Sequence, residues 1–233
     1  SYGGMIALSY AIAHEHDDES RRMMASMVLS STMSDIVKLY EAQWEEHVGP
    51  FGGLPPFVRR RIQQLSANDH AYQSDEFLVL AEHMLPLFSS RTWPPPDCLQ
   101  ASLDAATSVV NDRAFGSAST FVLDPNGTMA DFNVTSQLHS IHIPVLLTEG
   151  AHDVVPPRVI DVLEDKIPLT ERIMFLDSGH LSMIDQPDDM NDAIARFFDR
   201  VEGGSFLPNQ GRYSKEQTCS LTSDSLKWSS WMV

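Results

Sequence analysis

The feature that constrains the fold most is an alternation of short apolar runs and helical segments in the second half of the chain. Ile143–Leu147 and Ile173–Leu176 read as strands, and helices are expected over about 157–166 and 188–201. Strands that alternate with helices are typical of a parallel sheet with crossover connections. The sequence therefore predicts an α/β fold in which helices flank a parallel sheet.

A further strand–helix pattern opens the chain. Residues 1–18 begin with Ser-Tyr-Gly-Gly and continue into a helix that is apolar almost all round, which is typical of a deeply buried helix. Met23–Leu29 is a short apolar run that closes on Ser-Ser-Thr and reads as a buried strand. We assign residues 1–33 to the same core as the later alternation.

The segment between these two regions has a different character. Helical patterns dominate it, and Gly and Pro residues punctuate them; the expected helices span about 34–47, 55–66, 74–88 and 97–113. The sequence predicts a helical insertion over residues 34–130 and a return to the core over 131–202. Residues 203–233 are rich in Ser, Thr, Gln and Asn, and most of this tail is expected to be disordered.

Composition excludes several classes of function. The chain carries 32 acidic and 16 basic residues, a formal charge of −16, whereas a nucleic-acid binder needs a cationic surface. The sequence holds no apolar run long enough for a membrane-spanning helix, and no export signal, which favours the cytoplasm. Cys98 and Cys219 fit no metal motif and are expected to be reduced, and no metal or cofactor site is predicted.

Three residues at the ends of these elements have the types needed for nucleophilic catalysis. Ser1 stands where a small-residue turn enters a helix, Asp153 follows one predicted strand, and His180 follows the next. The order Ser, Asp, His along the chain is that of the α/β hydrolases. In that scheme Ser1 attacks a carbonyl carbon, His180 takes its proton, and Asp153 orients the imidazole.

The turn at Ser1 also predicts where an oxyanion would bind. The backbone N–H of Tyr2 follows the nucleophile and opens a helix, so it is expected to donate to the developing negative charge. An N-terminal serine is also the nucleophile in hydrolases whose own amine is the base, but those enzymes are built on antiparallel sheets. The strand–helix alternation argues against that class.

The sequence around these residues resembles the proline iminopeptidase family. The stretches that carry the resemblance are Ser-Tyr-Gly-Gly-Met-Ile-Ala-Leu-Ser-Tyr-Ala, then Ile-Pro-Val-Leu-Leu-Thr-Glu-Gly-Ala-His-Asp-Val-Val-Pro-Pro, and Asp-Ser-Gly-His with Gln-Pro soon after. The resemblance covers roughly residues 1–202. It implies an α/β-hydrolase fold with a helical cap, no cofactor, and removal of an N-terminal residue, often proline, from short peptides or amides.

Two positions depart from what the resemblance implies. Members of the family hold the substrate's amine with acidic side chains, whereas the matching positions here are Thr120 and Val154. Asp112, Asp124 and Glu76 are the carboxylates that could replace them, because an ammonium group in a dry pocket needs a counter-charge. The alternative is an esterase or amidase that acts on neutral small substrates.

The sequence begins at the nucleophile itself. An α/β hydrolase also needs earlier strands and a Gly-rich loop that supplies a second oxyanion donor. We therefore expect this chain to be the C-terminal part of a longer hydrolase and to be inactive alone. A non-catalytic pseudoenzyme with a retained scaffold is the remaining alternative, which the intact Ser1, Asp153 and His180 oppose. The sequence leaves the oligomeric state open.

Overall fold

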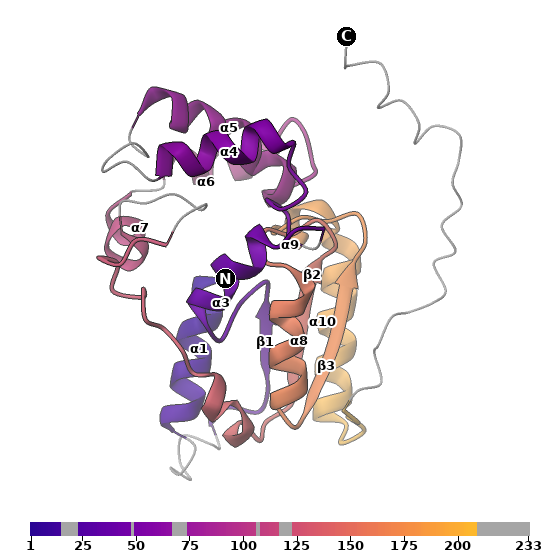
Figure 1. Ribbon diagram of the computed structural model, residues 1–233. Coiled ribbons are helices and arrows are strands. Elements are labelled where there is room, and N and C mark those ends of the chain that lie inside the picture. Colours follow the sequence, from indigo (N-terminus) through magenta and orange to yellow (C-terminus); the bar gives the residue numbers. More distant parts are fainter. Residues whose placement is uncertain (15–22, 48, 67–73, 106–107, 117–122, 209–233) are drawn as a thin grey trace.

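A three-stranded parallel sheet forms the centre of the molecule (Figure 1). The computed structural model describes residues 1–14, 23–47, 49–66, 74–105, 108–116 and 123–208. The strands lie in the order β1-β2-β3, with bounds β1 (Met27–Ser30), β2 (Val145–Gly150) and β3 (Thr170–Phe175). The predicted parallel sheet is confirmed. The predicted tail lies outside the described residues from position 209 onward.

Helices connect and flank these strands. Those beside the sheet are α1 (Tyr2–Ala13), α8 (Pro157–Lys166) and α10 (Pro187–Glu202). Those between β1 and β2 are α3 (Ile36–Trp44), α4 (Pro56–Ser66), α5 (Asp75–Ser89), α6 (Asp97–Ala105) and α7 (Ser108–Phe115). The described residues also form two short helices, η2 (Thr135–Ser140) and α9 (Ser182–Asp185). The single helix predicted over 97–113 is instead α6 and α7, and residues 106–107 between them lie outside the described residues.

The side chains of β3 alternate between the two faces of the sheet, as the period of a strand requires. Ile173 and Phe175 pack with Met190 and Ala193 of α10 on one face. On the other face, buried residues of α1 and α8 join Val145 and Leu147 of β2 in the main hydrophobic core. The fold is therefore a sheet between two helical layers, as expected for parallel strands.

Polar residues explain why β3 begins earlier than its apolar run. Thr170, Glu171 and Arg172 pair with Val145, Leu146 and Leu147 of β2 although they are not hydrophobic. Glu171 forms an ion pair with Arg200 of α10, and Arg172 contacts the acidic residues of α8. These partners satisfy the charges between the layers, so the strand extends through polar residues.

Helices α4 to α7, which we call the cap, lie beyond the carboxyl ends of the strands (Figure 1). The connection that leads into the cap starts at β1, and the chain returns to β2 through η2. Helix α3 contacts α8 and buries Ile36 and Leu39 in the main core. The insertion predicted between the strands is thus helical, while its exact limits of 34 and 130 stay a prediction.

Candidate active site

Two neighbouring loops bring Asp153 and His180 together. Asp153 follows β2 and His180 follows β3, and because these parallel strands are adjacent, their carboxyl ends open onto the same place. His180 Nδ1 lies 2.7 Å from Asp153 Oδ1. The Asp153 side chain is fully buried and that of His180 is 19% exposed. The loop histidine and loop aspartate predicted from the sequence therefore meet in a hydrogen bond.

The Asp153 loop is held by its own backbone. Asp153 Oδ1 also accepts a hydrogen bond from Val155 N at 2.8 Å, which fixes the carboxylate in its turn. Helix α8 then starts at Pro157, a residue that suits the first turn of a helix because its missing N–H is not needed there. Asp153 Oδ2 is buried and makes no hydrogen bond to the described residues.

The two loops continue the sheet's contacts past the strand ends. Ala151 N donates to Phe175 O at 2.9 Å, and His152 N donates to Ser178 O at 2.9 Å. A Cβ added at Gly150 would lie 2.1 Å from Gly179 O, well inside contact distance. Only glycine at 150 lets the loops approach this closely. The separation of Asp153 and His180 is therefore set by backbone contacts.

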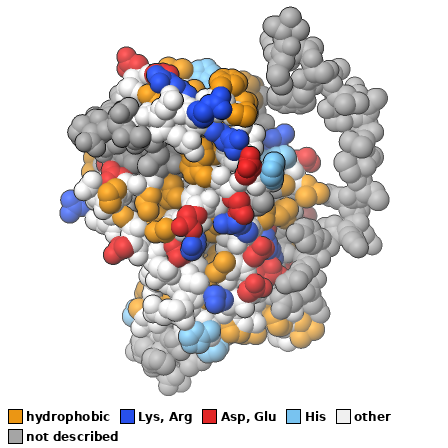
Figure 2. Space-filling model, in the orientation of Figure 1, with side chains coloured by type: hydrophobic (Ala, Val, Ile, Leu, Met, Phe, Trp, Pro, Cys, Tyr) orange, Lys and Arg blue, Asp and Glu red, His pale blue; other side chains and the backbone are white. Residues whose placement is uncertain are grey.

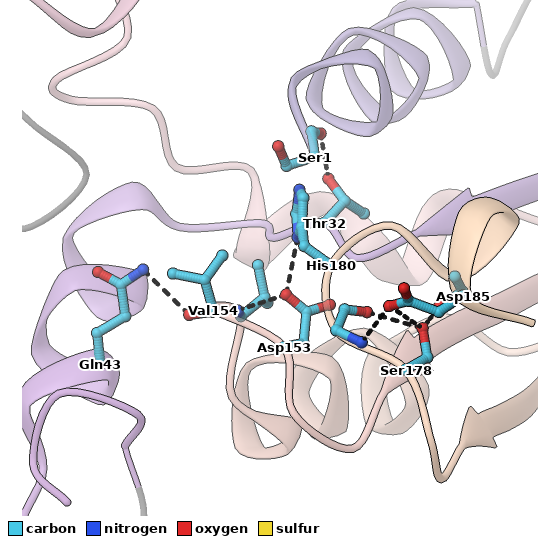
Figure 3. A network of polar contacts seen from close by, with 11 residues as sticks. Ser1, Thr32, Gln43, Asp153, Val154, Ser178, His180 and Asp185 are labelled. Atoms are coloured by element: carbon cyan, nitrogen blue, oxygen red, sulfur yellow. Dashed lines mark hydrogen bonds and ion pairs between the residues drawn. The ribbon is translucent and has the colours of Figure 1, made fainter. Parts of the chain in front are cut away.

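Ser1 lies across the His180 ring from Asp153 (Figure 3). It is the N-cap residue of α1 and is exposed, and its carbonyl accepts from Gly4 N at 3.0 Å and from Thr32 Oγ1 at 2.7 Å. A Cβ at Gly4 would clash with the Thr32 side chain, which explains the small residue there. Within the described residues, no hydrogen bond joins the Ser1 hydroxyl to His180.

Tyr2 is the first residue of α1, so its backbone N–H has no acceptor within the helix. The Tyr2 ring packs edge-to-face on Phe115, with ring centroids 5.7 Å apart. Phe115 ends α7, so this contact places the end of the cap beside the start of α1. A group bound near Ser1 would therefore meet the cap as well as the strand ends.

Gln43 of α3 supports the Asp153 loop, a role that the sequence did not reveal. Gln43 is buried, and its Nε2 donates to Val154 O at 3.1 Å (Figure 3). Its Oε1 is buried and has no hydrogen-bond partner among the described residues. The two residues are far apart in the sequence and are joined through a backbone carbonyl, so residue type and spacing hold no signal for this contact.

The three carboxylates considered as amine anchors occupy different environments. Glu76 and Asp112 are exposed, and Glu76 is paired with Arg61. Asp124 is only 7% exposed, and its Oδ1 accepts from the backbone and side-chain nitrogens of Asn126 at 2.8 and 2.9 Å. Asp124 packs against Gly116, the residue after Phe115. Of the three, Asp124 is the buried carboxylate.

Burial affects the phenol of Tyr40 beside Asp124. Burial, with a smaller contribution from the Asp124 charge, raises the pKa of Tyr40 to about 12. The phenol therefore stays protonated at neutral pH and can donate a hydrogen bond.

Thr120 lies outside the described residues, and Val154 is 9% exposed in the loop after Asp153.

A cluster of charged side chains around Arg172 lies between the sheet and α8. Arg172 Nε donates to Glu149 Oε1 at 2.5 Å, and Arg172 also binds Asp161 and Glu164 of α8. The Glu149 side chain is fully buried, and burial raises its pKa to about 7 in spite of the Arg172 charge. This cluster holds α8 against β2 and β3, and Glu149 lies on the strand that leads into the Asp153 loop.

The described residues contain no cluster of three or more His, Cys, Asp or Glu side chains that would suit a metal ion. The same part of the chain holds no helix whose length and hydrophobicity would let it span a membrane.

Comparison with known proteins finds proline iminopeptidases among the relatives of this chain. No protein-family model matches the chain. A proline iminopeptidase of Lacticaseibacillus rhamnosus is 45% identical over 64 residues, which cover 28% of this chain and 22% of the relative. A proline iminopeptidase of Thermoplasma volcanium is 26% identical over 205 residues, covering 86% of this chain and 63% of the relative.

A solved structure shares the fold. The crystal structure of a proline iminopeptidase from Mycobacterium smegmatis superposes with a TM-score of 0.72 at 20% identity, covering 87% of this chain and 64% of that one. The chain spans less than two thirds of the length of these relatives. The predicted α/β-hydrolase fold, with a parallel sheet and flanking helices, is confirmed.

Proposed function

Because the chain is a relative of the proline iminopeptidases and has the fold of the α/β hydrolases, we propose that it acts in serine-dependent acyl transfer. The observation that carries the proposal is the 2.7 Å contact between His180 Nδ1 and Asp153 Oδ1, with Ser1 on the other side of the ring. Asp153 selects the tautomer that carries its proton on Nδ1. Nε2 is then the nitrogen available to accept the proton of Ser1.

The reaction proceeds in two halves. Ser1 Oγ attacks the substrate carbonyl carbon while His180 Nε2 takes the hydroxyl proton, and the same proton then passes to the leaving group. Water repeats the sequence on the acyl-enzyme and releases the acid. The Ser1–His180 hydrogen bond forms on substrate binding, because catalytic hydrogen bonds tighten in the Michaelis complex. Asp153 stabilises the imidazolium throughout.

The start of α1 supplies part of the oxyanion site. The Tyr2 N–H is unused within the helix and stands next to Ser1, and the helix dipole adds positive potential at this end. A neighbouring oxyanion donor of this kind typically contributes a factor of about 10² to 10³ in turnover.

We further propose that the substrate presents an N-terminal residue, in keeping with the proline iminopeptidases that the chain resembles, and that Asp124 receives its ammonium group. Asp124 is buried beside the end of the cap, which contacts Tyr2 through Phe115. A carboxylate in such a place offers the counter-charge that a desolvated ammonium group needs. Proline is the residue expected at this position, and the cytoplasm stays the predicted location.

A neutral substrate is the second candidate, and Val154 favours it. This apolar side chain follows Asp153 directly and is largely buried. A site without a carboxylate next to Asp153 would accept an ester or amide that has no ammonium group.

The first experiment asks whether Ser1 is an activated nucleophile. The purified chain is treated with a fluorophosphonate probe, and the adduct is located by mass spectrometry, with heat-denatured protein and Ser1→Ala as controls. The proposal requires an adduct confined to Ser1 of the native protein, and that result would contradict the expectation that the chain is inactive alone. Folded protein without an adduct would point to the non-catalytic alternative for this chain.

The second experiment separates the two substrate classes. Prolyl arylamide is compared with its N-acetylated form in the wild-type protein and in Asp124→Asn. We expect the free amine to be preferred, and Asp124→Asn to lower kcat/KM for that substrate by about 10- to 100-fold, the value of a charge-assisted hydrogen bond. Preference for the acetylated form would support the neutral substrate and contradict the aminopeptidase proposal.

A further inference from the structure

The loop that carries His180 is bound directly to the end of the cap helix α5. His180 N donates to Phe88 O at 2.9 Å, and Leu181 N donates to Ser89 O at 2.8 Å. A Cβ added at Gly179 would lie 2.8 Å from Phe88 O, so the two backbones are in close contact. The histidine loop therefore touches the cap along a short run of backbone.

Asp185, at the end of α9, gathers hydrogen bonds from the cap side of this contact. One carboxylate oxygen, Oδ1, accepts four of them: from Ser90 Oγ at 2.7 Å, Arg91 N at 2.9 Å, Thr92 N at 3.0 Å and Thr92 Oγ1 at 3.0 Å. These donors belong to the residues that follow α5. A single side chain thus fixes the path of the chain as it leaves that helix.

The other oxygen of Asp185 accepts hydrogen bonds from the loop that carries His180. Oδ2 accepts from Gly179 N at 2.8 Å and from Ser178 Oγ at 3.4 Å (Figure 3). Gly179 directly precedes His180, so the bond acts one residue from the ring that meets Asp153. The two oxygens of one carboxylate therefore join two segments that are distant in the sequence.

The protonation state of Asp185 suits this role. Burial on its own would raise the pKa of Asp185, but the hydrogen bonds from Gly179, Ser90, Arg91 and Thr92 outweigh it and lower that pKa. The carboxylate is then ionised at neutral pH and presents only acceptors to its donors. Hydrogen bonds to an ionised acceptor are stronger than those between neutral groups.

We propose that Asp185 is a positioning residue that ties the cap to the His180 loop and thereby sets the alignment of the His180 ring with Asp153 and Ser1. The inference rests on the proposed function of these three residues. Asp185 reaches none of the reacting atoms itself. Its effect passes through the Gly179 N–H on one side and through the backbone of Arg91 and Thr92 on the other.

Asp185→Asn is the sharpest variant because it keeps the shape of the side chain. The amide offers one acceptor oxygen and one NH₂ group, so its NH₂ must face either the Gly179 N–H or the N–H groups of Arg91 and Thr92. Two donors then face each other, so the hydrogen bonds either to Gly179 or to Arg91 and Thr92 are lost. Asp188→Asn is the matched control. It replaces a carboxylate by an amide in the same way, three residues away, at an exposed site.

The experiment measures two properties in the wild-type protein and both variants, with circular dichroism to show that each is folded. The first is the low-field proton resonance of the His180 Nδ1–H···Asp153 hydrogen bond in the NMR spectrum. The second is the rate of fluorophosphonate labelling at Ser1. Asp185→Asn is expected to lose or broaden the resonance and to label about 10- to 100-fold more slowly, the usual cost of a misplacement near 1 Å. Asp188→Asn should match the wild-type protein in both.

The two readouts distinguish this inference from the proposed function. If the wild-type protein shows the resonance but no labelling, and Asp185→Asn loses the resonance, the positioning role stands and the proposed function fails. A folded Asp185→Asn that keeps both the resonance and the labelling rate would overturn the inference, as would a wild-type protein without the resonance. Should Asp185→Asn not fold, Ser90→Ala combined with Thr92→Val removes only the two cap-side hydroxyl donors, and unchanged readouts in that variant would overturn it.

Discussion

Helix α8 and the cap helices α4 and α5 treat their apolar side chains differently. On α8, Val159, Ile160 and Leu163 are 6%, 1% and 0% exposed and lie in the main core. On α4 and α5, Ile62 and Phe77 are buried in the same core, but Phe57 and Val79 are 69% and 51% exposed. Figure 2 shows hydrophobic side chains that reach the surface among charged ones on the upper part of this face, where the cap lies.

Ion pairs show the same difference. Arg172 is 10% exposed and meets a fully buried Glu149, whereas Arg61 and Glu76 in the cap are 47% and 49% exposed. Exposed pairs contribute little because water and salt screen them, while a buried charge depends on its partner. The difference teaches that buried charges support the sheet side next to the Asp153 loop, while surface charges contribute little to the cap. The cap is held by its buried apolar residues and by hydrogen bonds such as those of Asp185.

Removal of the buried arginine should have the largest effect. Arg172→Ala leaves Glu149 buried without its partner and removes the link from β3 to α8. We expect a loss of about 3–5 kcal/mol in the free energy of unfolding, the usual cost of breaking a buried ion pair. Urea unfolding at pH 7.5 would measure it. If Arg172→Ala costs no more free energy of unfolding than the loss of an exposed pair, the ion pairs of the sheet side and of the cap do not differ in their contribution to stability.

Truncation of an apolar side chain on α8 should come next. Leu163 is fully buried, so Leu163→Ala is expected to cost about 2–5 kcal/mol through lost burial and the cavity left behind. Val79→Ala on α5 is the control in the cap, where half of the side chain already contacts water. Chemical unfolding of both variants gives the comparison, and equal losses would contradict it.

The pH dependence of stability should be smaller for each pH unit and is specific to Glu149. Because burial raises its pKa from 4.5 to about 7, folded protein holds a proton there that unfolded protein has released. This group therefore makes the free energy of unfolding decrease as pH rises from about 4.5 to 7, by about 1 kcal/mol per pH unit, and to level off above. Glu149→Gln should remove this contribution. Parallel pH profiles of the wild-type protein and Glu149→Gln would show that Glu149 does not titrate in this range.

The smallest effect is expected for the exposed pair in the cap. Arg61→Ala removes the contact with Glu76, whose two side chains are about half exposed. We expect no measurable change in the thermal midpoint, at low or at high salt, because such pairs contribute little. A clear destabilisation at low salt would show that the cap depends on its surface charges more than its exposure indicates.

The sequence predicted the layers of the fold better than the limits of its strands. The helix expected over 157–166 is α8, because Pro157 marks its start and its apolar residues face one side. The strand expected at Ile173 begins instead at Thr170, since Glu171 and Arg172 find their partners on α10 and α8. Those partners are supplied by the folded layers, so local periodicity does not reveal them.

The site shows the same limit. Asp153 and His180 were expected together because each follows a strand, and parallel neighbouring strands bring such loops together. Gln43 and Asp185 could not be expected in the same way. They act on backbone groups of distant segments, and a backbone N–H or carbonyl has the same chemistry at nearly every position.

The register of the sheet has a consequence for the order in which the protein folds. Val145 pairs with Thr170 across a single helix, whereas its other partner, Met27, is separated from it by the whole cap segment. Closing the shorter loop costs less chain entropy, and distant pairings form more slowly. We therefore expect β2, α8 and β3 to assemble first and β1 to join them late. Pulsed hydrogen exchange during refolding would show this as early protection of the amides of β2 and β3 and late protection of Val28 and Leu29.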